Sequence, residues 1–209
     1  MDVVDELLRG HTHFRSDYLR REGDFLRRLA SEGQSPDAFF VGCSDSRVVP
    51  ELLTSSAPGE LFVVRNVANL VPPFDHPDAS VGAALEYAVG VLEVRHLVVC
   101  GHDGCGGVEA MLDGGKKLYA FASLAEWLSN VTPAVERSRD NDRATWWRRA
   151  VEENVLEQLG NVTTFPIARE ALERGDLELH GWVYDLRALE LRVYEADEDR
   201  FRPASQLLA

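Results

Sequence analysis

The chain has few cysteines, an excess of acidic over basic side chains, and no long apolar run. Three cysteines among 209 residues are an odd number and too few for a disulfide scaffold. The formal net charge of −13 argues against nonspecific binding to nucleic acids or anionic membranes, although a small anionic substrate stays compatible with a locally positive pocket. No apolar run approaches the roughly 18 residues of a transmembrane helix. We therefore expect neither a nucleic-acid-binding nor a membrane protein.

The composition and the first residues point to a cytoplasmic protein. Hydrophobic residues make up 45% of the chain and charged residues 27%, which is typical of a globular protein with a sizeable core. Residues 1–6 are acidic and lack the basic-then-apolar order of a signal peptide. In a cytoplasmic chain, cysteines that accompany a histidine indicate metal binding or catalysis before disulfides.

The N-terminal segment predicts a helix over residues 2–31. Its apolar side chains recur at helical spacing, and residues 33–36 break the pattern. Such a helix either packs on its own domain or reaches over a partner subunit, and the pattern favours neither. We expect residues 1–34 to form a helical arm and residues 35–209 to form a single α/β domain.

The rest of the chain predicts an α/β fold. Apolar strands are expected at residues 38–42, 61–64, 96–100 and 177–184, and residues 79–92 carry the stripe of an amphipathic helix. Strand, helix and strand in this order favour a parallel sheet with a right-handed crossover. The connection to a further strand at residues 189–194 is too short for a crossover. The prediction is a mostly parallel, doubly wound sheet of four strands plus an antiparallel edge strand.

Chemically useful side chains follow two of these strands. Cys43 comes after the first, and His102 and Cys105 come after the third. If the two strands are neighbours in a parallel sheet, their carboxyl ends share one edge, where ligands usually bind. Two thiolates and one imidazole make a catalytic type of zinc site with one open position. Taken singly, Cys43 is also compatible with a buried apolar residue, and His102 and Cys105 with a chance spacing.

Asp45 and Arg47 lie two and four residues after Cys43. An Asp–Arg pair can be bidentate, which fixes the carboxylate and keeps it ionised. Such a carboxylate can accept the proton of a zinc-bound hydroxide, or it can move onto the metal as a fourth ligand. Alone, such a pair is more often a loop salt bridge. Cys100 lies within a strand, and we assign it to the core.

With these residues in view, the chain resembles the β-class carbonic anhydrases. The resemblance implies Zn²⁺ on Cys43, His102 and Cys105, with Asp45 and Arg47 beside it. It also implies a helical arm around a partner and self-association as a dimer or tetramer. The motifs that carry it are Cys43-Ser-Asp45-Ser-Arg47, residues 59–69, residues 101–107 and His180-Gly-Trp-Val-Tyr184-Asp.

The activity that the resemblance implies is reversible hydration of carbon dioxide to bicarbonate and a proton. Zinc-bound hydroxide attacks the carbon, Asp45 orients the hydroxide, and Arg47 holds Asp45. Some members of the family also have a closed state, in which Asp45 ligates the zinc, and a bicarbonate site that favours closure. The matching positions here are Phe40, Arg65 and Tyr184. Since Phe40 lacks the indole N–H that a tryptophan supplies, we expect weakened inhibition by bicarbonate.

Two other functions are compatible with the same motifs. One is a hydrolase of carbonyl sulfide or carbon disulfide on the same scaffold, and the other is a non-catalytic zinc- or bicarbonate-binding protein.

Asp103 departs from the pattern expected for the family. It either raises the pKa of the zinc-bound water or points outward to hydrogen-bond a backbone amide, and we expect the second.

Overall fold

The computed structural model describes residues 2–116, 118 and 120–207. The chain divides into two compact units, Met1–Ser35 and Pro36–Ala209. In the described residues, no helix combines the length and the apolar character needed to cross a membrane.

The N-terminal unit is helical over nearly the range expected from the sequence. It consists of α1 (Val3–His13), a π-helical turn (Phe14–Tyr18) and α2 (Leu19–Glu32). The side chain of Asp2 accepts a hydrogen bond from the amide of Val4, and Gly33 ends α2 with a φ of 86°. The π-helical turn interrupts the single α-helix that apolar periodicity predicted, and the rings of Phe14 and Tyr18 stack across it.

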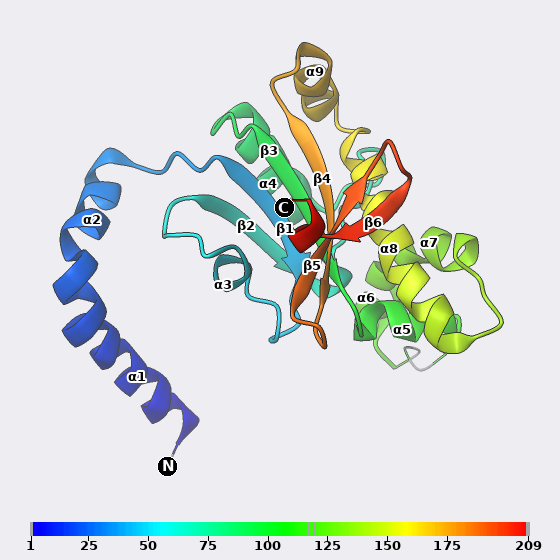
Figure 1. Ribbon diagram of the computed structural model, residues 1–209, viewed down its shortest axis with the longest axis horizontal. Coiled ribbons are helices and arrows are strands. Elements are labelled where there is room, and N and C mark those ends of the chain that lie inside the picture. The colour runs from blue at the N-terminus through cyan, green and yellow to red at the C-terminus, as the bar shows by residue number, and fades with distance from the viewer. Residues whose placement is uncertain (1, 117, 119, 208–209) are drawn as a thin grey trace. The chain divides into compact units, whose positions relative to one another are not determined.

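In the part of the chain that the structure describes, six strands form one mixed sheet in the order β2-β1-β3-β4-β5-β6 (Figure 1). The first four strands in this order are parallel, as predicted. β5 is antiparallel to β4, also as predicted. The strands are β1 (Ala38–Cys43), β2 (Leu61–Asn66), β3 (His96–His102), β4 (Glu178–Asp185), β5 (Glu190–Glu195) and β6 (Arg200–Pro203).

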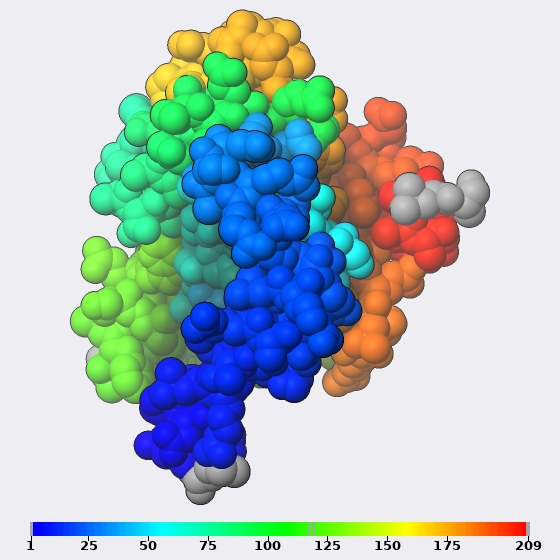
Figure 2. Space-filling view, turned by 90° about the vertical axis from the view of Figure 1, so that its left-hand side faces the viewer, coloured from blue at the N-terminus to red at the C-terminus, as the bar shows by residue number. Residues whose placement is uncertain are grey.

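The edge position belongs to β6 rather than to β5, which corrects the sequence-based prediction. β6 is antiparallel to β5. It escaped notice because its four residues, Arg-Phe-Arg-Pro, contain one large apolar side chain and end in a proline. Proline is confined to edge strands because it cannot donate to a neighbour. β6 and residues 204–207 give the red surface of the α/β unit on the right of Figure 2.

Two apolar clusters cover the two faces of the sheet. On one face, α8 packs against β3 and β4, and α4 packs against β2. Gly101 allows this close approach, because a Cβ there would lie 2.9 Å from a methyl group of Val155. The opposite face carries a smaller cluster that includes Phe40, Tyr184 and Cys100, which is fully buried as predicted. The helices of the unit are α3 (Pro50–Thr54), α4 (Ala79–Gly90), α5 (Gly106–Leu112), α6 (Ala122–Leu128), α7 (Thr132–Arg137), α8 (Arg143–Val162) and α9 (Pro166–Arg174).

Candidate functional site

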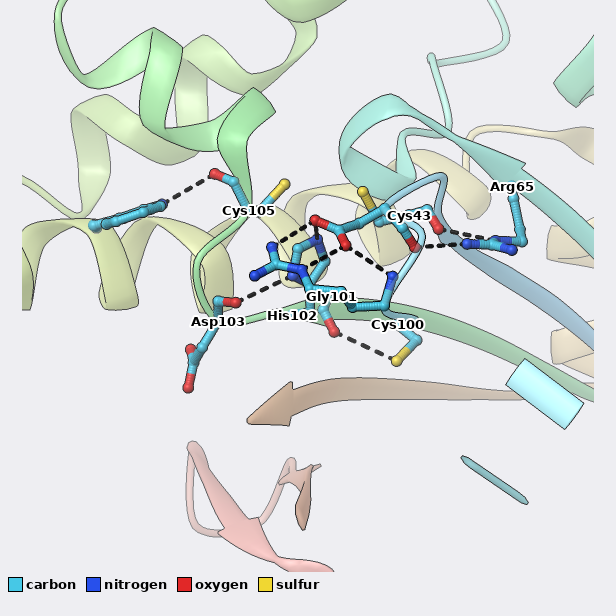
Figure 3. Close-up of polar contacts among 10 residues, drawn as sticks. Cys43, Arg65, Cys100, Gly101, His102, Asp103 and Cys105 are labelled. Atoms are coloured by element: carbon cyan, nitrogen blue, oxygen red, sulfur yellow. Dashed lines mark hydrogen bonds and ion pairs between the residues drawn. The ribbon is translucent and has the colours of Figure 1, made fainter. Parts of the chain in front are cut away.

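Three predicted side chains converge where β1 and β3 end. β1 and β3 are parallel neighbours, and their register pairs Gly42 with Cys100. Cys43 and His102 therefore reach the same edge of the sheet, and Cys105 lies at the start of α5 just beyond it. The ligand atoms of Cys43, His102 and Cys105 all lie within 4.8 Å of one another, and all three residues are buried. Figure 3 shows both sulfur atoms on one side of the His102 ring.

The protonation of His102 follows from its surroundings. Its Nδ1 lies 3.1 Å from the carbonyl oxygen of Asp103, which can only accept, so Nδ1 carries the proton. In the neutral ring the lone pair is then on Nε2, which is buried and has no hydrogen-bond partner among the described residues. A buried nitrogen without a partner is costly. A metal ion would satisfy it, and a backbone carbonyl is a common partner for the other nitrogen of a histidine ligand.

The three cysteines differ in the pKa of their thiols. A hydrogen bond from the Cys105 thiol lowers the pKa of Cys43 to about 4, against the opposing effect of burial. Donating that hydrogen bond raises the pKa of Cys105. Burial raises the pKa of Cys100 to about 12, so this thiol stays protonated. Cys43, Cys105 and His102 thus offer the soft sulfur and nitrogen atoms that suit zinc, whereas calcium and magnesium prefer oxygen.

Asp45 and Arg47 form the bidentate pair expected from the sequence. The Nε of Arg47 donates to Oδ1 at 2.8 Å and Nη2 donates to Oδ2 at 2.7 Å, while the backbone amide of Arg47 also donates to Oδ1. These bonds hold the pKa of Asp45 well below its ordinary value. The Oδ2 atom lies 3.8 Å from the Nε2 of His102, so an ionised carboxylate borders the three converging side chains.

The three residues expected to bind bicarbonate are not equivalent. Phe40 and Tyr184 belong to one buried cluster, and Phe40 lies edge-on to Trp182. Arg65 instead donates to the carbonyl oxygens of Cys43 at 3.0 Å and Asp45 at 2.7 Å. Figure 3 shows its guanidinium reaching this loop. Arg65 therefore holds the loop that carries the site.

Asp103 points away from the two site cysteines, as expected (Figure 3). Its partner differs from the expected backbone amide, because the carboxylate accepts from Nη2 of Arg192 at 3.0 and 3.1 Å. Arg192 lies on β5 and also pairs with Glu152 on α8. The sequence could not show this contact, since Asp103 and Arg192 are 89 positions apart.

Sequence reasoning missed the polar residues of α8 that hold the loops of the site. The indole N–H of Trp147 donates to the carbonyl of Cys105 at 3.1 Å. The Asn154 amide donates to the carbonyl of Ala68 at 3.0 Å, and Gln158 accepts from the amide of Val71 at 2.8 Å. A signal was present, because Asn154 and Gln158 are one helical turn apart within an apolar stripe.

Comparisons with known proteins agree on one family. The sequence profile of the family described as carbonic anhydrase matches residues 38–191. A carbonic anhydrase of Pseudomonas aeruginosa is 40% identical over 203 residues, covering 96% of this chain and 90% of its own length. A carbonic anhydrase of Synechococcus elongatus is 37% identical over 190 residues, covering 89% of this chain and 70% of its own.

Solved structures show the same relationship. The β-carbonic anhydrase CcaA superposes with a TM-score of 0.89 at 36% identity, covering 96% of this chain and 91% of its own. A Coccomyxa β-carbonic anhydrase in complex with acetazolamide has a TM-score of 0.82 at 31% identity, covering 92% of this chain and 86% of its own. A structure of tetrameric β-carbonic anhydrases from Sordaria macrospora has a TM-score of 0.82 at 28% identity, covering 92% of this chain and 97% of its own. With the converging cysteines and histidine at the matching strand ends, the chain belongs to the β-class carbonic anhydrase family of enzymes.

Proposed function

We propose that this protein catalyses the reversible hydration of carbon dioxide to bicarbonate and a proton, with Zn²⁺ held by Cys43, His102 and Cys105. The observation that carries the proposal is the buried Nε2 of His102, which lacks a hydrogen-bond partner in the described chain and belongs to a group of ligand atoms, with the two thiol sulfurs, that all lie within 4.8 Å of one another. Zinc bound there would supply a Lewis acid that lowers the pKa of a bound water molecule to near neutral.

Asp45 is the proposed hydrogen-bond acceptor for the attacking oxygen. Its pKa is held low, chiefly by Arg47, so the carboxylate is ionised at neutral pH and can only accept. When water adds to carbon dioxide, the attacking oxygen donates its remaining proton in a hydrogen bond to Asp45, which directs a lone pair at the carbon. Arg47 is the positioning residue, because it occupies one lone pair on each carboxylate oxygen. The proton lost from water leaves to buffer, which balances the reaction.

A closed state of the same site is part of the proposal. Asp45 lies 3.8 Å from the Nε2 of His102, so a modest movement away from Arg47 would make its carboxylate a fourth ligand. We further propose that Phe40, Arg65 and Tyr184 mark a weakened bicarbonate site. Its weakness follows from the phenyl ring of Phe40, which has no hydrogen-bond donor.

Self-association and a cytoplasmic location complete the proposal. The Sordaria macrospora relatives are described as tetrameric. In the N-terminal unit taken by itself, α1 exposes an apolar stripe that a second copy would bury, which favours a dimer or a tetramer of dimers. The stripe consists of Val3, Val4, Leu7 and Leu8, which are 55–71% exposed.

The cytoplasmic location is proposed because the three cysteines are free, as in a reducing compartment.

Stopped-flow hydration of carbon dioxide by the zinc-loaded protein tests the proposed activity. We expect rapid turnover in the unaltered protein and a loss of about 10²-fold or more in Asp45→Asn, which keeps the shape but removes the charge. Asp176→Asn is the matched control, because Asp176 also pairs with an arginine two residues away but is exposed. Bound zinc without hydration would overturn the proposal, and a parallel assay with carbonyl sulfide would then separate a hydrolase from a non-catalytic protein.

A further inference from the structure

A second group of potential metal ligands lies at the opposite end of β3, one of the two strands that carry the site. His96 begins β3, whereas His102 ends it. At about 3.3 Å per residue, the two ends of this strand are about 20 Å apart. The parallel register places Glu178 of β4 directly beside His96. His180 is two positions further along β4 and so faces the same side of the sheet as Glu178.

The distances within this group suit a metal ion. The Nδ1 of His96 lies 3.2 Å from the Nε2 of His180. Two nitrogen atoms that each lie about 2.0–2.1 Å from a tetrahedral ion are about 3.3 Å apart, so the two rings already have the required spacing. The Oε2 of Glu178 lies 3.7 Å from His96 and 3.9 Å from His180. It needs to move by only a few tenths of an ångström, and its side chain is 69% exposed.

The protonation and exposure of the group also favour a cation. Burial lowers the pKa of His180, and the neighbouring His96 lowers it further. His180 is therefore largely neutral at physiological pH and has a free lone pair. Glu178 adds one negative charge next to both rings. The side chains of His96 and His180 are 41% and 32% exposed, so a hydrated ion can enter and keep water in its remaining positions.

A hydrogen bond between the two rings also explains their 3.2 Å separation, and so the arrangement of the carboxylate decides between the two interpretations. A ring-to-ring hydrogen bond needs no third group. Here the carboxylate of Glu178 lies within 4 Å of both ring nitrogens that face each other, and the ligand atoms of all three residues fall within 4.8 Å. Three donors around one point are the minimum for a metal site with open positions.

We propose that His96, Glu178 and His180 bind a second divalent transition-metal ion, distinct from the ion of the Cys43 site. Two imidazoles and one carboxylate suit Zn²⁺, Co²⁺ or Ni²⁺ better than Mg²⁺ or Ca²⁺, which prefer oxygen ligands alone. The ion would join the starts of β3 and β4, the strands that place His102 and Tyr184 at their far ends. It stabilises the folded protein by mass action, because the unfolded chain does not hold the three ligands together.

Titration of the zinc-loaded protein with Co²⁺ tests this site. We expect a second metal equivalent per chain and Co²⁺ absorption without a thiolate charge-transfer band, since no sulfur belongs to the ligand set. A charge-transfer band would instead report exchange at the cysteines. The melting temperature should rise with Co²⁺ concentration. His96→Gln, His180→Gln and the exposed Glu178→Gln should lose the second equivalent and the thermal shift.

His76→Gln is the matched control, because its side chain is a histidine in an exposed loop. The His76→Gln variant should bind the second equivalent of Co²⁺ to the same extent as the unaltered protein. A metal content that saturates at one equivalent per chain, or equal loading in His76→Gln and Glu178→Gln, would overturn the proposal. Glu178→Gln keeps this test decisive if a histidine variant folds poorly. Because metal counting does not depend on hydration of carbon dioxide, its result is separate from that of the activity assay.

Discussion

The guanidinium of Arg47 lies side-on to the carboxylate of Asp45 and binds both of its oxygens, at 2.8 and 2.7 Å. The backbone amide of Arg47 reinforces the pair at 3.0 Å. The orientation of Asp45 is thus fixed by hydrogen bonds within the five-residue segment that begins at Cys43. Only a planar fork of donors can make this contact.

Arg47→Lys should therefore lower carbon dioxide hydration by about 10-fold or more while leaving zinc content unchanged. Lysine keeps the positive charge but offers a single point contact, so the carboxylate becomes free to rotate. Stopped-flow kcat alongside the measured zinc content checks this. Arg174→Lys, in an exposed Arg–Asp pair of the same spacing, is the control. Unchanged kcat in Arg47→Lys would show that the bidentate geometry is unnecessary.

The metal-free protein should hold about one thiolate per chain at neutral pH. A hydrogen bond from Cys105 lowers the pKa of Cys43 to about 4, whereas the pKa of Cys105 is raised. Since an unfolded cysteine has a pKa of about 8.5, the stability that Cys43 contributes is complete above that pH. It is lost as the pH falls towards about 4.

Thiolate absorbance in the ultraviolet, followed during an acid titration of the metal-free protein, measures this ionisation. The signal should fall with a midpoint near pH 4 and should disappear in Cys43→Ser. Cys100→Ala should not change it, because burial raises the pKa of Cys100 to about 12. A chain with no thiolate signal at neutral pH would contradict the prediction.

Gly101→Ala should destabilise the protein by about 1–3 kcal/mol, because overpacking forces the core to shift. The added Cβ would lie 2.9 Å from Val155 and 3.3 Å from Val151, both on α8. Chemical denaturation of the metal-free protein measures the change. Gly160→Ala on the same helix meets nothing within 4 Å and should be stabilising by up to about 1 kcal/mol. Equal stability of the two variants would count against tight packing of α8 on β3.

Phe40→Trp should increase inhibition by bicarbonate relative to the unaltered protein. The indole N–H supplies the donor that the phenyl ring lacks. Because Phe40 is only 1% exposed, the larger ring should also cost about 1–3 kcal/mol of stability, to be measured in parallel. Phe62→Trp, which packs against the cluster on the opposite face of the sheet, is the control. Bicarbonate inhibition as strong in the unaltered protein as in Phe40→Trp would refute the prediction.

Much of the fold and the centre of the site follow from local pattern. Apolar runs and helical stripes predicted the four parallel strands, and a short connection predicted the antiparallel strand that follows them. Neighbouring parallel strands must bring their carboxyl ends together, so Cys43 and His102 could be placed at one edge before any coordinates. The Asp45–Arg47 pair was predictable for a different reason, because its partners are only two residues apart in the chain.

Only the tertiary structure decided the contacts between residues that are distant in the chain. Arg192 meets Asp103 across 89 positions, and His96 meets His180 across 84. β6 was missed because its pairing with β5, rather than its own four residues, makes it a strand. Such contacts depend on strand order and register, which bring together side chains that carry no signal for one another in the sequence. The residue types of the candidate site could therefore be read from short motifs, whereas the contacts around it were decided by the packing of distant segments.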